Sequence, residues 1–279
     1  MNSLIESLKN NKHIYEIGVF INMRFADLVT VPFQKIKIKL RRWNFIDKKR
    51  YSKLRNLKNT HKGERCFIIA TGPSLTFEDL ALLKNETTFC VNSIVKVLDK
   101  LDYVPNYIGI QDAFVFEKIG KQIEECSIEN VFLTPNLYKK ISNPNKKNYY
   151  QFPHFSPLGG HPERRKCKFF FSDKADEVIY DGNSITYSLL QIAVYMGFCE
   201  IYLLGCDCSY IPVNGKQYFV ESGHIDKQAI SVGERMIQAF ATAKKWIEEN
   251  RPDVKIYNST RGGMLEVFPR KTVDMIFGK

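Results

Sequence analysis

The chain has 279 residues, 44% hydrophobic and 25% charged, a composition that excludes a disordered or fibrous protein. Its formal net charge is +11, and residues 35–65 alone carry that excess, with thirteen Lys and Arg against two acids. The rest of the chain is therefore neutral overall, which argues against a nucleic-acid-binding protein with cations spread over its folded surface. The seven cysteines include no Cys-x-x-Cys pair and no signal peptide opens the chain, so we expect reduced cysteines, no metal site and a cytoplasmic protein.

Residues 1–62 are predicted to form a basic, amphipathic, helical N-terminal arm. The stretch 14–29 is strongly apolar, but Glu16, Arg24 and Asp27 argue against a membrane-spanning helix. The basic run 35–43 follows it. Apolar groups that insert and cations that meet anionic lipid predict a helix lying on the inner face of the cell membrane. The alternative is a helical hairpin packed on the domain or on a partner chain, with a solvated basic face.

Residues 63–279 are predicted to form one Rossmann-like α/β domain, a mostly parallel sheet with helices on both faces. The first strand, 66–70, ends in the turn Thr71-Gly72-Pro73-Ser74. Glycine allows a tight turn, and Ser74 can cap the helix that follows. A strand that passes through such a turn into a helix directs backbone N–H groups at an anion, so we expect a phosphate or nucleotide here. An ordinary βα turn is the alternative.

Short apolar runs alternate with helical stretches along the rest of this domain. Strands are expected at 66–70, 88–92, 106–110, 130–133, 177–180, 200–204 and 254–257, and helices at 77–84, 93–101, 114–125, 185–197 and 227–249. The stretch 135–176 breaks the alternation. We expect an insertion there that acts as a lid over the ligand edge of the sheet, with an ordinary surface excursion as the alternative.

Polar residues follow several of these strands, at the edge where such sheets bind ligands. Asn92, Gln111 and Asp112 follow the second and third strands, and the amides of Asn92 and Gln111 suit a base edge or ribose hydroxyls. The run Gly182-Asn183-Ser184-Ile185-Thr186 opens the most apolar helix, where Ser184 or Thr186 could bind a phosphate with help from the helix dipole. Helix capping is the alternative role for both groups.

The strand 200–204 leads into Gly205, Asp207 and Tyr210, with Tyr218 and His224 downstream. His224 lies in a Tyr-rich loop before a long predicted helix and is a candidate general base, or else a surface or capping residue. Asp207 is not part of an Asp-x-Asp pair, the usual metal clamp of metal-dependent glycosyltransferases. We therefore expect hydroxyls, amides and a helix N-terminus to stabilise a leaving phosphate.

Several short motifs occur in a fixed order: Gly72-Pro73-Ser74-Leu75, Asn92, the run 192–203, Gly205-x-Asp207, Asn214-Gly215-x-x-Tyr218 and Gly223-His224. In these motifs the chain resembles, over roughly residues 64–258, the small bacterial sialyltransferases that transfer sialic acid from its CMP ester onto lipooligosaccharide. It also resembles the broader family that contains flagellin-modifying glycosyltransferases and an archaeal 6-hydroxymethylpterin diphosphokinase. Residues 257–263 and 268–270 are more typical of that relative.

The resemblance implies roles for individual residues. The Gly72 turn would hold donor phosphate or ribose, and Asn92 would contact the nucleotide. Tyr210 and Tyr218 would donate hydrogen bonds to the departing phosphate, while His224 would deprotonate the acceptor hydroxyl. The chain departs from the sialyltransferases in having Thr71 in place of Asn and Gly182 in place of Arg, and this leaves the donor sugar open.

We therefore expect a metal-independent, peripheral-membrane glycosyltransferase that uses a nucleotide-activated sugar, first of all a CMP-sugar, and no cofactor. It would build a bacterial capsule, another surface polysaccharide or lipooligosaccharide. Its expected partners are the donor, a glycan or glycolipid acceptor, the anionic membrane surface and a second copy of the chain, but not nucleic acid. One alternative is an ATP-dependent diphosphotransferase like the pterin enzyme, with Mg²⁺ on Asp112 or Asp207. Another is a non-catalytic nucleotide-binding subunit of an envelope complex.

Overall fold

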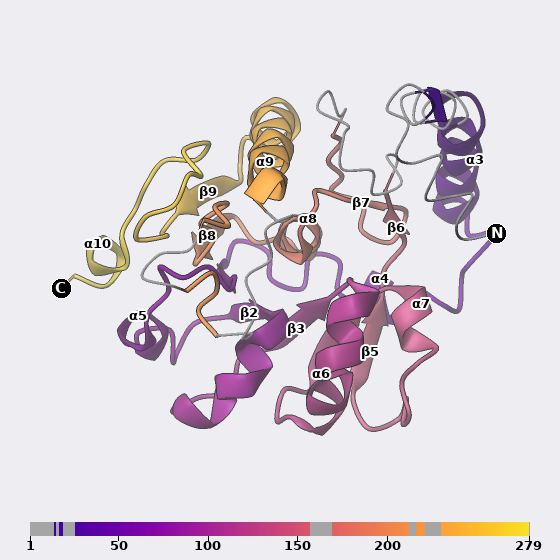
Figure 1. The fold of residues 1–279 in the computed structure, drawn as a ribbon. Helices are drawn as coiled ribbons and strands as arrows, with labels where there is room; N and C mark the ends of the chain where they lie inside the picture. The colour runs from indigo at the N-terminus through magenta and orange to yellow at the C-terminus, as the bar shows by residue number, and fades with distance from the viewer. Residues whose placement is uncertain are drawn as a thin grey trace.

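A seven-stranded parallel sheet forms the centre of the protein (Figure 1). The computed structural model describes residues 14, 17–18, 26–156, 169–211, 216–220 and 230–278. The strand order is β5–β4–β3–β2–β1–β8–β9, which confirms the predicted Rossmann-like α/β class. The strands are β1 (Arg65–Ile69), β2 (Thr88–Val91), β3 (Tyr107–Ile110), β4 (Asn130–Leu133), β5 (Asn148–Gln151), β8 (Glu200–Leu204) and β9 (Lys255–Asn258). A separate parallel pair consists of β6 (His154–Phe155) and β7 (Ile179–Tyr180).

Helices cover both faces of the sheet, and the predicted N-terminal helix is present. The α-helices are α3 (Val31–Arg42), α4 (Ser52–Arg55), α5 (Phe77–Ala81), α6 (Ala113–Glu125), α7 (Pro135–Tyr138), α8 (Ile185–Met196), α9 (Ile230–Asn250) and α10 (Val273–Phe277). A π-helical turn, η1 (Ala26–Thr30), precedes α3, and a 3₁₀ segment, η2 (Asn92–Lys100), follows β2. The helix predicted at 93–101 is therefore 3₁₀ in character.

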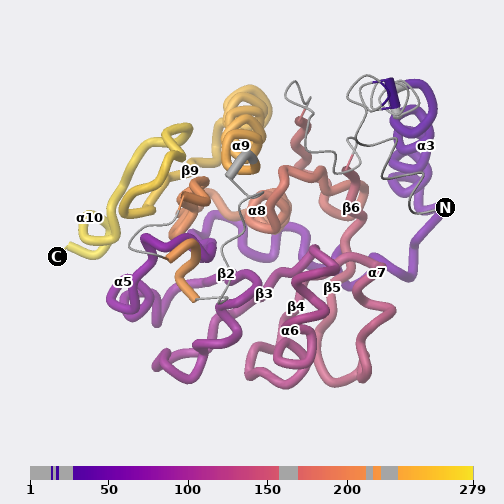
Figure 2. Tube along the Cα trace, viewed as in Figure 1, coloured from indigo at the N-terminus to yellow at the C-terminus, as the bar shows by residue number. Residues whose placement is uncertain are grey.

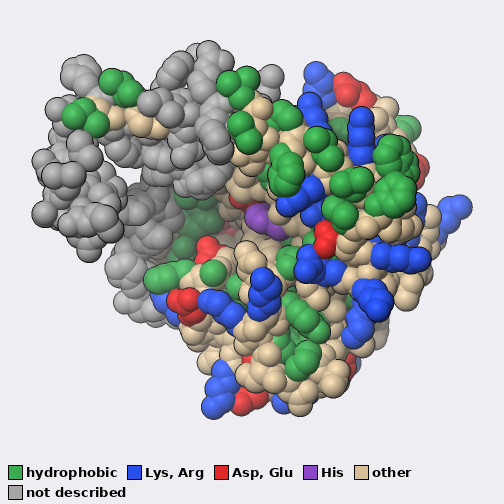
Figure 3. Space-filling model, turned by 90° about the vertical axis from the view of Figure 1, so that its right-hand side faces the viewer, with side chains coloured by type: hydrophobic (Ala, Val, Ile, Leu, Met, Phe, Trp, Pro, Cys, Tyr) green, Lys and Arg blue, Asp and Glu red, His purple; other side chains and the backbone are tan. Residues whose placement is uncertain are grey.

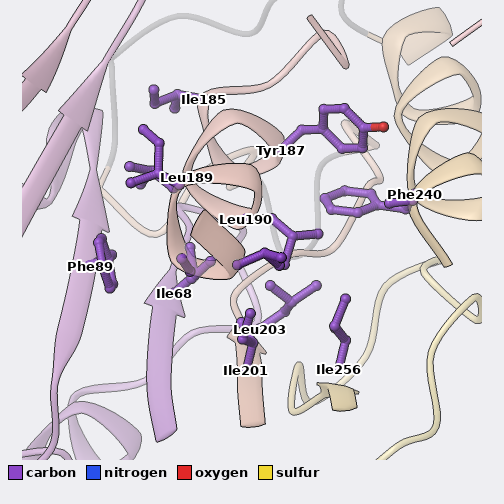
Figure 4. Close-up of a cluster of buried hydrophobic side chains, with 14 of the residues drawn as sticks. Ile68, Phe89, Ile185, Tyr187, Leu189, Leu190, Ile201, Leu203, Phe240 and Ile256 are labelled. Carbon is purple, nitrogen blue, oxygen red and sulfur yellow. The ribbon is translucent and has the colours of Figure 1, made fainter. Parts of the chain in front are cut away.

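Alternating side chains of the central strands supply two hydrophobic layers. Cys66 and Ile68 of β1 face α8 and α9, while Phe67 and Ile69 face α5, η2 and α6 (Figure 1). Every residue of α8 is buried, because this helix lies between the sheet and α9. Figure 4 shows its side chains against those of β1 and β8, with Phe240 of α9 meeting the Tyr187 ring at a centroid distance of 5.6 Å. Burial of each large apolar side chain contributes about 1.5–3 kcal/mol.

The order of the strands reverses between β1 and β8. From β1 the chain adds β2, β3, β4 and β5 in one direction, and then returns to place β8 and β9 on the other side of β1 (Figure 2). The helices that follow β1 and β8, α5 and α9, therefore lie on opposite faces of the sheet. In open parallel sheets the crevice at such a reversal, at the carboxyl ends of the strands, is where ligands bind.

The stretch 135–176 contributes more regular structure than the sequence analysis predicted. It contains α7, β6 and β5, and β5 pairs with β4 as the edge strand of the main sheet. The sequence of β5, Asn-Tyr-Tyr-Gln, has no aliphatic residue, so its pattern does not mark it as a strand. Residues 157–168 lie outside the described part of the chain, and the lid therefore stays a prediction.

The folded core begins before residue 63. Tyr51 and Leu54, which the sequence analysis assigned to the arm, are buried, and Leu54 belongs to the layer of α8. The backbone N–H groups of Asn59, His61 and Gly63 then donate to carbonyls at the end of α8 and its cap, at 2.9–3.2 Å. By contrast, α3 has no buried residue. None of the helices formed by the described residues is long and apolar enough to cross a membrane.

Paired alanine substitutions test where the arm ends and the core begins. We expect Leu54→Ala to lower the free energy of unfolding by about 2–5 kcal/mol, because it leaves a cavity beneath α8. Ile36→Ala removes a comparable side chain that is 55% exposed on α3, and should change it by less than about 0.5 kcal/mol. Urea unfolding of both variants measures the difference; equal effects would contradict this boundary.

Candidate functional site

A cavity of about 1090 Å³ lies at the carboxyl ends of β1, β2, β3 and β8. Twelve of the fifteen predicted site residues line it: Thr71, Gly72, Asn92, Gln111, Asp112, Asn183, Ser184, Thr186, Gly205, Asp207, Tyr210 and Tyr218. Pro73 and Ser74 belong to the same turn but do not line the cavity, and His224 lies outside the described residues. The volume is of the size that small-molecule and cofactor sites have.

The turn after β1 packs directly on the turn after β8. The Gly72 N–H donates to the carbonyl of Gly205 at 2.8 Å, and Ser74 Oγ donates to Asp207 Oδ2 at 2.8 Å. A Cβ atom on Gly72 would lie 1.8 Å from that same Oδ2, so only glycine fits here. Ser74 is therefore not the helix cap that the sequence suggested. Thr76 caps α5 instead, accepting the Asp79 N–H.

Asp207 is buried in this contact, with 5% of its surface exposed. Burial raises the pKa of its carboxyl group, against the hydrogen bonds of Ser74 and the positive charge of Arg270. The C-terminal motif supports it from the other side: Gly263, at φ +77°, lies against the Asp207 backbone, and the Met264 N–H donates to the Asp207 carbonyl at 2.7 Å. The residues typical of the pterin enzyme thus hold the β8 turn in place.

Asn92 carries two unfavourable features at the cavity wall. Its backbone has φ +47°, in the left-handed region, and such strain costs of order 1–3 kcal/mol for a non-glycine residue. Its Oδ1 is buried and has no hydrogen-bond partner among the described residues, which costs about 1–3 kcal/mol. A ligand donor, such as a hydroxyl or an amine, would satisfy this oxygen. The geometry suits the predicted nucleotide contact.

Two other predicted polar residues serve the protein's own structure. The Asp112 carboxylate caps α6, accepting the N–H groups of Phe114 and Val115 at 2.7 and 3.1 Å. Ser184 caps α8, accepting the Thr186 N–H at 3.1 Å. For Asp112 and Ser184, therefore, the structure shows the capping role that the sequence analysis offered as the alternative.

Gln111 is held in a polar network that the sequence does not reveal. Its Oε1 accepts from Ser188 Oγ at 2.7 Å, and its Nε2 donates to Asp181 Oδ1 at 3.5 Å. His154 Nε2 lies 3.7 Å from the same Asp181 oxygen. Burial alone would raise the pKa of the Asp181 carboxyl, but the nearby His154 side chain, the Asn183 N–H and Ser156 outweigh it and lower that pKa. Asp181 lines the cavity wall, and these neighbours favour its charged form.

The sequence analysis missed this histidine and carboxylate. They lie at β6 and just after β7, two strands of two residues each, which are too short to show a periodic signal. It also missed two lysines that line the cavity, Lys96 on η2 and Lys118 on α6. Lys118 Nζ lies 4.3 Å from the ring centroid of Phe114, whose side chain is 65% exposed. Lys96 lies four positions after Asn92, a helical spacing that could have marked it.

Tyr210 and Tyr218 lie side by side, as the resemblance implied for residues of one site. Their ring centroids are 5.9 Å apart, with an interplanar angle of 69°. The segment 216–220 is held against the strand ends by the Phe219 N–H, which donates to the Thr71 carbonyl at 2.9 Å. Gln217 Nε2 donates to the Tyr210 carbonyl at 2.9 Å. Two phenols from separate segments thus meet at one cavity.

Two cysteine side chains, Cys206 and Cys208, flank Asp207 at the cavity. Cys206 and Cys208 lie on either side of Asp207 with their Sγ atoms 4.0 Å apart, and hydrogen bonding to Cys208 together with burial raises the pKa of the Cys206 thiol. The six cysteines among the described residues are free thiols. Within that part of the chain, no three His, Cys, Asp or Glu side chains are grouped so that they could hold a metal ion.

Comparison with known proteins gives a family match and several similar solved structures, two of which are described here. A family model described as 6-hydroxymethylpterin diphosphokinase MptE-like matches residues 41–212. The MAf glycosyltransferase from Magnetospirillum magneticum AMB-1 is similar with 17% identity and a TM-score of 0.46, over 82% of this chain but only 40% of that one. The sialyltransferase CstII from Campylobacter jejuni, solved with cytidine-5'-monophosphate, has 16% identity and a TM-score of 0.46, over 77% of this chain and 87% of that one.

No curated protein matches the chain. The two groups that the motifs resemble, the sialyltransferases and the family of the pterin diphosphokinase, both recur among the matches. The chain spans less than half of the Magnetospirillum protein.

The tight contact at Gly72 is open to a matched test. Gly72→Ala should lower the free energy of unfolding by about 1–3 kcal/mol, because its Cβ would overlap Asp207 Oδ2 and the Gly205 carbonyl. We also expect it to abolish nucleotide binding at the cavity. Gly262→Ala is the control, since a Cβ there meets nothing within 4 Å. Thermal unfolding with and without nucleotide separates the two variants; a Gly72→Ala protein as stable as the control would contradict the packing described above.

Proposed function

We propose that this chain, which belongs to the 6-hydroxymethylpterin diphosphokinase MptE-like family, binds a nucleotide-activated substrate in its cavity and is a glycosyltransferase. The observation that carries this proposal is the meeting of Tyr210 and Tyr218 at the cavity, which the N-terminus of α8 also lines. Phenol O–H groups and helix N–H groups are donors suited to the charge that develops on a leaving phosphate. The donor proposed first is a CMP-sugar, on the motifs shared with the sialyltransferases.

The proposed reaction is a direct displacement. The acceptor hydroxyl attacks the anomeric carbon of the sugar, and the bond from that carbon to the phosphate oxygen breaks with its electron pair leaving on the phosphate. Tyr210 and Tyr218 donate hydrogen bonds to this phosphate, and His224 takes the proton of the acceptor hydroxyl. Asn92 Oδ1, unpaired among the described residues, accepts from the nucleotide. No metal ion takes part in this scheme, and the product is a bacterial surface polysaccharide, a capsule or a lipooligosaccharide.

The second candidate is an ATP-dependent diphosphotransfer onto a pterin-like acceptor. Two observations favour it: the description of the family, and the presence of Lys96 and Lys118 at the cavity, where cations suit a polyphosphate. It needs Mg²⁺. The carboxylates suggested as its ligands are engaged by the protein, Asp112 as the cap of α6 and Asp207 by Ser74. A non-catalytic nucleotide-binding subunit is the third reading, and it predicts that His224 is dispensable.

A thermal-shift series distinguishes the first two candidates. CMP without added metal should stabilise the protein by about 2.7 kcal/mol at 100 times its dissociation constant. UDP and GDP serve as nucleotide controls, and ATP is tested with and without Mg²⁺. Stabilisation by ATP with Mg²⁺ alone would favour the diphosphotransferase. No response to any nucleotide would remove the premise that the cavity binds one.

Separate substitutions of two histidines test the catalytic assignment. His224→Ala should lower turnover by about 10²–10⁴-fold while CMP affinity stays near wild type, since a positioned base acts on the transition state. His154→Ala alters the histidine beside Asp181. If His154→Ala gives that loss instead, with His224→Ala still active, the base is His154. If both proteins keep most of their turnover with a verified donor and acceptor, neither residue is the base.

A further inference from the structure

The cations of the N-terminal arm divide into two groups. Among those at the end of α3, Arg41 Nε pairs with Asp47 Oδ2 at 3.0 Å within the arm, and Arg42 Nη2 pairs with Glu177 Oε2 of the domain at 3.0 Å. Arg41 Nη1 also donates to the Glu177 carbonyl at 3.1 Å. Glu177 lies two residues before β7, the strand that leads into Asp181 of the cavity wall. The end of α3 is thus attached to the part of the domain that carries the proposed active site.

The three lysines of α3 have no such partner among the described residues. Lys35, Lys37 and Lys39 form no salt bridge with the described residues, and α3 contains no acidic side chain. Lys37 Nζ instead lies over the Phe33 ring, 4.6 Å from its centroid. Three positive charges are therefore presented to the surroundings of the protein.

Large apolar side chains are exposed among these lysines. Phe33 is 54% exposed and Ile36 is 55% exposed, and their spacing places them on one side of α3. Leu28, in the turn before the helix, is 74% exposed, and Val29 is 49% exposed. Figure 3, which views the side of the molecule where α3 lies, shows Lys and Arg side chains scattered among hydrophobic ones. Water is an unfavourable environment for such an apolar cluster.

We propose that this surface, the α3 face made of Leu28, Val29, Phe33, Ile36, Lys35, Lys37 and Lys39, docks on an anionic lipid bilayer. The apolar side chains would enter the boundary between headgroups and acyl chains, and the lysines would meet headgroup phosphates. A second copy of the chain fits less well, because a two-fold contact would bring these lysines against one another. Docking of this surface does not require a particular donor nucleotide, so the proposal is independent of the proposed function.

The ion pairs of Arg41 and Arg42 add a consequence for function. The Arg42–Glu177 pair and the Arg41 hydrogen bond to the Glu177 carbonyl attach the docked helix to the segment that leads through β7 into the cavity wall, so the bilayer would lie at a constant distance from the site. An acceptor carried by a lipid would then be presented to the cavity from one side. The sequence alone suggested a basic arm, whereas the structure assigns its arginines to attachment and its lysines to the lipid.

Sedimentation of the full chain with vesicles tests the docking surface. We expect binding to vesicles of equal parts phosphatidylglycerol and phosphatidylcholine, and little binding to phosphatidylcholine alone. A lysine near such a surface contributes about fivefold in affinity, so Lys35→Gln, Lys37→Gln and Lys39→Gln together should weaken binding about 100-fold. The control replaces three exposed lysines elsewhere, Lys121, Lys139 and Lys146, with glutamine and changes the net charge equally. It should bind nearly as the wild type does.

A second variant separates insertion from charge attraction. Phe33→Ser with Ile36→Ser should weaken vesicle binding at least tenfold with an unchanged melting temperature, because both side chains are exposed in the folded protein. The proposal is overturned if the full chain ignores anionic vesicles, or if the lysine variant binds as tightly as its control. It is also overturned if the serine variant leaves vesicle binding unchanged but converts a dimer to a monomer in sedimentation velocity, since the face would then be a contact between copies.

Discussion

The close approach of the β1 and β8 turns is the constraint on which the site depends. These strands are neighbours at the point where the sheet order reverses; the helices that follow them lie on opposite faces of the sheet, and the cavity lies at the carboxyl ends of the strands. The two turns touch through the Gly72 N–H and the Gly205 carbonyl, and Ser74 bonds Asp207 across the same contact. Any side chain at Gly72 would occupy the place of the Asp207 carboxylate, and the wall of the cavity would have to shift.

The polar residues that follow the strands either cap a helix or remain available to a ligand in the cavity. Parallel strands end at one edge, so residues after each of them meet at one cavity, but each following helix also needs a cap for its free N–H groups. Asp112 and Ser184 meet that need for α6 and α8. Asn92 does not: its Oδ1 stays unpaired among the described residues, and its backbone is strained. Ligand binding is therefore best sought at Asn92 and at the tyrosine pair.

Electrostatics separates the outer surface from the site. The excess positive charge of the chain lies in the arm. Arg41 and Arg42 form salt bridges with Asp47 and Glu177, whereas the lysines of α3 form none with the described residues. At the cavity the charges are fewer and more closely matched, with Asp181 beside His154. The proposed lipid-binding surface and the cavity lie in different parts of the molecule. The ion pair between Arg42 and Glu177, at the end of α3, connects the helix to the domain that carries the cavity.

The sequence by itself determined the fold class, because short apolar runs alternating with helical stretches are a local pattern that favours a parallel sheet. It also placed twelve predicted residues at the cavity, because residues that follow parallel strands share one edge. Only the tertiary structure decided which of them are engaged by the protein: whether Ser74 caps a helix or bonds Asp207 depends on a residue far along the chain. The same holds for His154 and Asp181, which lie 3.7 Å apart but 27 positions apart in sequence, on strands too short to leave a periodic signal.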